Sequence, residues 1–157
     1  MKLREIVVEK AIVPSLSGLK RDEVLAELLD ALVAADAAPT AHRDALLKGI
    51  IARERRGSTG FGHGVAVPHV KTAEVPSIRV AVGISETGID FGALDKQPVH
   101  SVFLLLSPES RPEEHIDAME AIFANLSRDQ FRRFLRQAST ADDVLTLLEE
   151  ADAAQAG

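Results

Sequence analysis

The spacing of apolar residues divides the chain into helices at both ends and strands in the middle. An apolar stretch at 11–16 predicts a strand, and apolar residues at helical spacing predict an amphipathic helix over 19–35. A second helix is predicted to start after Thr40, which would serve as its N-cap, and to end at the glycine-containing breaker that begins with Gly57.

Extended segments follow this helix, and the pattern then returns to helices. The predicted strands are 65–67, 78–85 and 99–107. The predicted helices are 113–126, 130–138 and 142–151. A continuous apolar run at 102–106 is typical of a central strand buried on both faces. We therefore expect an α/β fold, a single-domain sandwich whose central mixed β-sheet is flanked by helices on both faces. The domain is expected to cover 1–152, with 153–157 as a frayed tail.

Composition is that of a folded intracellular protein. Hydrophobic residues make up 46% and charged residues 27% of the 157 positions, which suits one ordinary domain. The absence of cysteine excludes disulfides, thiol catalysis and thiolate-bound zinc. The N-terminus is charged and no apolar run reaches membrane-spanning length, so we expect a cytoplasmic location without membrane insertion.

Charge argues against nucleic-acid binding, because the net charge is -6, no basic stripe is present, and Trp and Tyr are absent. One basic cluster, Arg53, Arg55 and Arg56, stands directly before the glycine-containing loop. Helical geometry places Arg53 and Glu54 on the apolar side of the second helix and points Arg56 away from it. Arg53 is therefore expected to face inward and to need an anionic partner.

The loop at 57–69 combines four glycines, two hydroxyl side chains and a Pro-His pair. Glycines let backbone N–H groups turn toward one point, and such concave arrays bind phosphate. Ser58 and Thr59 can add hydroxyl donors, and Arg53 can add a planar guanidinium suited to phosphate oxygens. Pro68 restricts the backbone just before His69 and so limits where the imidazole can point.

His69 is the candidate nucleophile of this loop. An imidazole with a free pKa of about 6.5 is largely neutral near pH 7 and can form covalent intermediates. A phosphoryl group on a ring nitrogen stays transferable because imidazole is a reasonable leaving group. The pattern alone leaves a structural interpretation open, since glycine-rich turns that join a helix to a strand are common.

The spacing from Glu54 to His69 resembles the motif of the fructose/mannitol class of phosphotransferase-system (PTS) enzyme IIA domains. The matching residues are Glu54, then Phe61-Gly62, then Val65-Ala66-Val67-Pro68-His69. The resemblance covers nearly the whole chain. It implies that His69 is the phosphoacceptor and that Arg53 and Thr59 line the pocket. We expect no cofactor and no metal. Val70 departs from the pattern, because the residue after the histidine is usually small; a β-branched residue there narrows the approach to His69.

The resemblance also implies a second histidine beside the phosphoacceptor, and His115 matches it. Ser110 and Glu113 predict a capping box, which would place His115 in the first turns of the following helix. His115 either orients His69 or hydrogen-bonds the phosphoryl oxygens, or it simply lies at the rim of the core. The histidines expected to be ordinary loop, surface or strand-edge residues are His42, His63 and His100.

Several functions fit this family. The loop entry, Arg53-Glu54 and then 57–60, is similar to that of the nitrogen-regulatory enzyme IIA subgroup. Such a protein would accept a phosphoryl group from an HPr-like protein in a phosphoenolpyruvate-dependent relay and act on regulatory target proteins. The alternatives are a transport component that passes phosphate to an enzyme IIB for fructose/mannitol-type sugars, and an unphosphorylated interaction module. Metal-dependent hydrolysis is disfavoured because a spacing such as H-E-x-x-H is missing.

Overall fold

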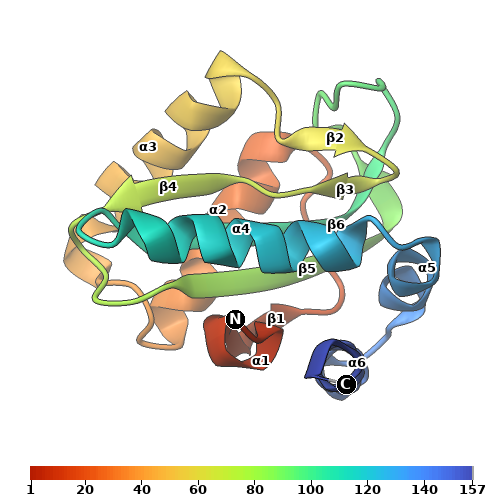
Figure 1. Ribbon diagram of the computed structural model, residues 1–157. Helices are drawn as coiled ribbons and strands as arrows, with labels where there is room; N and C mark the ends of the chain where they lie inside the picture. Colours follow the sequence, from red (N-terminus) through yellow and green to blue (C-terminus); the bar gives the residue numbers. More distant parts are fainter. Residues whose placement is uncertain (157) are drawn as a thin grey trace.

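A six-stranded mixed sheet runs through the middle of the molecule, and helices cover both of its faces (Figure 1). The computed structural model describes residues 1–156. The strands are β1 (Val7–Val13), β2 (Gly60–Gly62), β3 (Val65–Ala66), β4 (His69–Thr72), β5 (Arg79–Ile89) and β6 (Val99–Pro108). The helices are α1 (Leu3–Ile6), α2 (Arg21–Ala34), α3 (Arg43–Arg56), α4 (Pro112–Leu126), α5 (Asp129–Gln137) and α6 (Ala141–Ala156). The predicted α/β fold with a mixed sheet is confirmed.

The sheet has the order β1-β5-β6-β3-β2, and β4 also pairs with β6. β3 and β4 lie one after the other along the same edge of β6, both parallel to it. The interruption falls at Pro68, which has no N–H to donate to a ladder. Its carbonyl oxygen still accepts a hydrogen bond of 2.9 Å from Leu105 N–H, so the chain stays against β6 and pairing resumes at His69.

Two apolar cores lie on the two faces of the sheet. α1, α4, α5 and α6 cover one face, where Ile122 and Leu148 are fully buried. α2 and α3 cover the other face, where Leu28 and Ile50 are fully buried. The run at 102–106 contributes to both cores, because successive side chains of a strand point to opposite faces. The prediction of a central strand buried on both sides is confirmed.

The chain between the predicted elements is more ordered than the sequence indicated. The first strand is Val7–Val13 and not 11–16, because it follows directly on α1. β2 and β4 were missed: Gly60–Gly62 has little strand propensity, and His69–Thr72 lacks an apolar alternation. Both short strands owe their conformation to pairing with neighbours in the sheet.

Two predicted helix caps are wrong. Thr40 begins a 3-10 turn, η1 (Thr40–His42), and α3 starts only at Arg43. Ser110 and Glu113 do not form a capping box, because α4 begins at Pro112 with Arg111 as its N-cap residue. Proline has its φ angle preset for the first helical position and lacks the N–H that a cap would satisfy.

The last helix is longer than predicted. α6 continues to Ala156 instead of ending near 151, so 153–156 are helical. The reason is local: alanine has the highest helix propensity, and no breaker occurs before Gly157, which lies outside the described residues. Within 1–156, no helix combines the length and the apolar character that a membrane span requires.

Candidate functional site

The two candidate histidines lie side by side at one end of the sheet. His69 is the first residue of β4, which pairs with β6, and His115 lies in the first turns of α4, which follows β6. Their ring centroids are 5.4 Å apart and the rings are tilted by 54°. The fold therefore brings together the two residues that the family resemblance singled out.

Both imidazoles line a cavity of about 340 Å³ with a cationic wall. The residues lining this cavity are Gly49, Arg53, Arg56, His69, Val70, Lys71 and His115. No carboxylate is among them, although the chain as a whole carries a net charge of -6. Three cations around two histidines make a site suited to a phosphoryl group.

A hydrogen bond to the backbone fixes the orientation of the His69 ring. Its Nδ1 lies 2.9 Å from the carbonyl oxygen of Val67. A carbonyl oxygen can only accept, so Nδ1 carries the proton and Nε2 keeps a free lone pair. The acceptor is available because Val67 and Pro68 leave the ladder where β3 ends and β4 has not yet begun.

The surroundings of His69 keep its imidazole neutral. Burial lowers the pKa of His69 below its ordinary value, the bond to Val67 opposes this shift, and the positive charge of Arg53 adds to it. Lys71 acts in the same direction as Arg53. A neutral imidazole with a free nitrogen is the form that can act as a nucleophile.

His115 is a buried histidine held by a serine. His115 is only 8% exposed. Its Nδ1 is 2.7 Å from the hydroxyl oxygen of Ser107, a fully buried residue of β6. Burial, followed by the charges of His69 and Lys71, lowers the pKa of His115 to about 4. Ser107 was not singled out from the sequence. The sequence did contain a signal for it, because Ser107 is the polar residue that directly follows the apolar run at 102–106.

Glu54 anchors the loop that precedes His69. Its side chain is 2% exposed and its carboxylate accepts hydrogen bonds from the hydroxyl and the backbone N–H of Thr59, the latter at 3.2 Å. The Ser58 hydroxyl accepts a bond of 3.0 Å from the N–H of Gly60. Neither Ser58 nor Thr59 lines the cavity around His69. The two hydroxyls thus hold the loop in shape in this structure.

The arginines at the end of α3 differ partly from prediction. Arg53 is half-buried and lines the cavity as expected, but its guanidinium donates to the carbonyl oxygen of Gly57 at 2.9 Å, and no carboxylate within residues 1–156 pairs with it. Arg56 was predicted to point away and instead lines the same cavity, because its long side chain at the last turn of α3 reaches round the helix end. Lys71 was missed, although the two-residue period of a strand places it on the side of His69.

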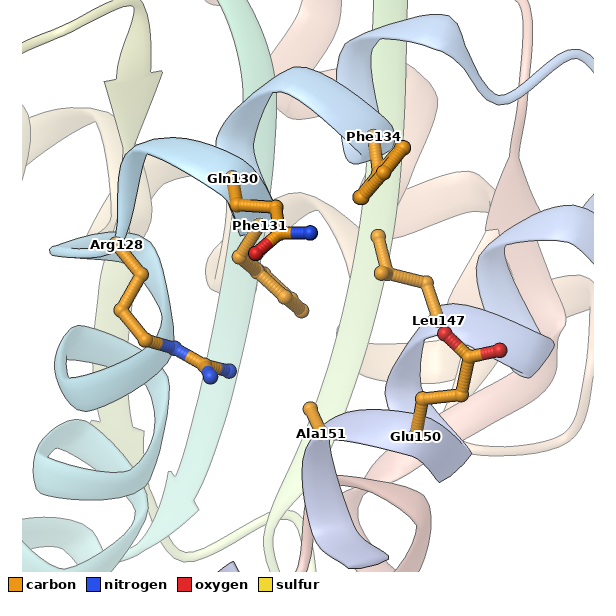
Figure 2. A pocket seen from close by; sticks show the side chains of 7 residues that line it. All are labelled: Arg128, Gln130, Phe131, Phe134, Leu147, Glu150 and Ala151. Atoms are coloured by element: carbon orange, nitrogen blue, oxygen red, sulfur yellow. The ribbon is translucent and has the colours of Figure 1, made fainter. Parts of the chain in front are cut away.

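A second hollow, between α5 and α6, is shown in Figure 2. It has a volume of about 210 Å³, and Phe134 of α5 faces Leu147 of α6 across it. Arg128 lies at its edge, with its guanidinium carbon 5.9 Å from the centre of the Phe131 ring. None of the seven residues that line this hollow is a histidine, so the chemistry expected from the sequence belongs to the His69 cavity.

The chain as a whole matches a known family. Residues 5–151 match the family described as "Phosphoenolpyruvate-dependent sugar phosphotransferase system, EIIA 2". The chain belongs to this family of PTS enzyme IIA domains.

Some relatives within the family are named as nitrogen regulatory proteins and others as fructose-specific components of the PTS. The chain is 35% identical over 142 residues to the "Nitrogen regulatory protein" of Pseudomonas aeruginosa, covering 90% of this chain and 91% of that protein. It is 31% identical over 152 residues to the "PTS system fructose-specific EIIABC component" of Bacillus subtilis, covering 97% of this chain but 24% of that longer protein. Among solved structures, nitrogen regulatory protein IIA-Ntr of Neisseria meningitidis superimposes with a TM-score of 0.83 at 28% identity, over 92% of this chain and 97% of that chain.

Proposed function

We propose that this chain is a phosphocarrier that accepts a phosphoryl group on Nε2 of His69 and passes it on. The observation that carries this proposal is the hydrogen bond from His69 Nδ1 to the Val67 carbonyl oxygen, which leaves Nε2 free. Membership of the PTS enzyme IIA family supplies the donor class, an HPr-like phosphocarrier in a phosphoenolpyruvate-dependent relay. Such a relay operates in the cytoplasm, where phosphoenolpyruvate is formed.

The transfer exchanges one nitrogen–phosphorus bond for another. Nε2 of His69 attacks the phosphorus of the donor's phosphohistidine, the new N–P bond forms, and the donor imidazole leaves with the electron pair of the old bond. The His69 ring, still protonated on Nδ1, gains positive character during the attack. The Val67 carbonyl oxygen stabilises that charge because it already accepts the Nδ1 proton.

Cationic side chains and His115 stabilise the incoming phosphoryl group. Arg53, Arg56 and Lys71 line the cavity and provide charge-assisted hydrogen bonds to the phosphoryl oxygens. If the Ser107 hydroxyl donates to Nδ1 of His115, the imidazole carries its proton on Nε2 and can donate to a phosphoryl oxygen. Ser58 and Thr59 contribute indirectly, by holding the loop with Glu54 and Gly60.

The downstream role that we favour is regulation. Support comes from the nitrogen regulatory proteins of Pseudomonas aeruginosa, Bradyrhizobium diazoefficiens and Neisseria meningitidis, each of which matches this chain over more than nine tenths of its own length. The second candidate is sugar transport with an enzyme IIB as acceptor, supported by the fructose-specific relative of Bacillus subtilis. Incubating the phosphorylated chain with enzyme IIB proteins from the same organism separates the two, since only a transport component loses its phosphate to one of them.

Intact-mass analysis tests the proposed chemistry. The protein and its His69→Ala variant are incubated with phosphoenolpyruvate, an enzyme I and an HPr-type carrier. An acid-labile gain of one phosphoryl group is expected for the protein and none for the variant. If neither chain gains mass with several such donors, the unphosphorylated interaction module becomes the better account.

A further inference from the structure

Another cationic hollow lies away from the cavity around His69, and it is not the hollow shown in Figure 2. It has a volume of about 150 Å³. Its polar walls are formed by three arginines and one carboxylate of α5, two histidines and a serine: Arg132, Arg133, Arg136, Asp129, His63, His100 and Ser101. None of these residues lines the cavity around His69. Three arginines and one aspartate leave an excess of positive charge in this hollow, although the chain as a whole has a net charge of -6.

The hollow is well separated from the phosphoacceptor. Ser101 lies opposite Val65 of β3, whereas His69 lies opposite Leu105, four residues further along β6. At about 3.3 Å per residue, the two positions are roughly 13 Å apart along the strand. A ligand in the hollow would therefore occupy a different site from the phosphoryl group on His69.

The arginines are held in place by the opposite side of their helix. Phe131 and Leu135 are buried and fix α5 against the sheet. The side chain of Arg132 is also fixed by a hydrogen bond of 2.7 Å, which its guanidinium donates to the carbonyl oxygen of Leu126. This side chain is 14% exposed. The backbone of α5 and the side chain of Arg132 are therefore preorganised, which reduces part of the entropy that binding an anion would cost.

The positive charge of the hollow is only partly neutralised. Asp129 pairs with Arg133 at 3.1 Å and lies 3.6 Å from Arg132. Arg136 takes part in no ion pair among residues 1–156. Arg132 and Arg136 are one helical turn apart, where like charges repel. A bound anion would relieve this repulsion.

The wall opposite α5 is shaped by a strained turn. His63 and Gly64 form the two-residue turn between β2 and β3, with φ angles of 60° and 74°. A positive φ is uncommon for a residue with a side chain, and such strain is often retained where a side chain has a role. Ser101, which is 2% exposed, is the hydroxyl-bearing residue of this wall. The ring of His100 is oriented by a hydrogen bond of 2.9 Å from its Nδ1 to the Ser85 carbonyl oxygen.

We propose that this hollow, the α5 anion site, binds the phosphate group of a small molecule, either inorganic phosphate or a phosphorylated metabolite. Sites for larger organic ligands occupy about 300–1,000 Å³, so this one holds only a phosphate-sized group and leaves the rest of a metabolite outside. Three guanidinium groups and a hydroxyl offer more donors than the two oxygens of a carboxylate can use. The α5 anion site does not depend on the proposed chemistry of His69.

Amide chemical shifts test this proposal. The ¹⁵N-labelled protein is titrated at fixed ionic strength with sodium phosphate, fructose 1-phosphate and sodium acetate. Saturable shifts are expected at Gly64 and Ser101 with both phosphates and not with acetate. Equal affinity for the two phosphates would identify the free ion as sufficient, and tighter binding of fructose 1-phosphate would identify a phosphorylated metabolite.

Exposed arginines in α5 and at its N-cap provide the variant and its control. Arg133→Gln combined with Arg136→Gln is expected to weaken phosphate binding by about tenfold or more, because each removes a charge-assisted hydrogen bond. Arg128→Gln removes the same charge at the N-cap of α5, where the side chain lines the hollow between α5 and α6 and not the α5 anion site, and is expected to leave the affinity within about twofold. The proposal is overturned if Gly64 and Ser101 show no saturable shift, if acetate binds equally well, or if Arg128→Gln weakens binding as much as the double variant.

Discussion

At His69, one hydrogen bond determines which nitrogen can react. The Val67 carbonyl oxygen takes the Nδ1 proton, and burial with nearby cations disfavours a second proton on the ring. The hydrogen bond in turn depends on the gap in strand pairing between β3 and β4, which contains Val67 and Pro68. The residue type could be read from the sequence, whereas its protonation state required the structure.

His115 should make the stability of the fold sensitive to acid. In the unfolded chain its imidazole binds a proton near its ordinary pKa of 6.5, but in the folded protein only near pH 4. Between these values the unfolded state holds more protons, so stability is complete above about pH 6.5 and falls as the pH drops toward 4. The loss from this group is on the order of 1–3 kcal/mol. Urea denaturation at several pH values measures it.

The matched variant for this measurement is His115→Gln, whose amide can still bond to Ser107 but does not titrate. Its stability should change less between pH 7.5 and pH 5 than that of the unmodified protein. His69 has a lowered pKa as well and contributes in the same direction in both proteins, so it cancels in the comparison. An identical pH dependence in the two proteins would show that His115 is not the group responsible.

At the scale of elements, α3 and β4 form the site by packing closely together. A Cβ atom added to Gly49 of α3 would lie 3.3 Å from Cγ2 of Val70 in β4. Val70 was the one departure from the family motif, and the structure shows that a glycine in the facing helix makes room for it. Both residues line the cavity, so this contact sets its width on one side of His69.

A double-mutant cycle tests the contact between Gly49 and Val70. Alanine is favoured over glycine inside a helix by about 1 kcal/mol. With Val70 present, Gly49→Ala should gain little, because the new methyl group is too close to the valine. With Val70→Ala, the same change should give the full gain of about 1 kcal/mol, measured by chemical denaturation. Equal gains in both backgrounds would show that the two side chains do not compete for space.

The elements also show which parts of the fold a sequence can predict. α2 and β6 were placed within a few residues, since their apolar patterns are long and regular. β4 was missed because four mixed residues carry no period, and only pairing with β6 makes them a strand. Arg56 and Lys71 were missed for a related reason: a cavity wall is assembled from α3 and β4, and neither segment reveals it alone.

At the scale of the whole molecule, the two ends of the chain are tied together. The Asp152 carboxylate of α6 accepts hydrogen bonds from the backbone N–H groups of Leu3 at 2.7 Å and Arg4 at 3.0 Å. Asp152 is 9% exposed and Leu3 is 1% exposed, so these bonds are shielded from water. This tie adds to the helix propensity of the alanines in holding the last turns of α6 against the start of the chain, and the sequence alone gave no indication of it.

Removing this tie should destabilise the whole fold. Asp152→Ala leaves the buried N–H of Leu3 and the partly buried N–H of Arg4 without an acceptor and is expected to cost about 2–3 kcal/mol in the free energy of unfolding. Glu149→Ala is the control: it removes a carboxylate from the same helix whose ion pair with Arg4, at 3.2 Å, is exposed, and it should cost less than about 1 kcal/mol. Equal losses in thermal or urea unfolding would contradict the role given to Asp152.

The measurement that tests the central claim most directly is long-range ¹H–¹⁵N correlation spectroscopy of the phosphorylated protein. It identifies which histidine carries the phosphoryl group and on which nitrogen. We predict a phosphoryl group on Nε2 of His69, with Nδ1 still protonated and bonded to Val67. A phosphoryl group on Nδ1 of His69, or on His115, would contradict this account of the site.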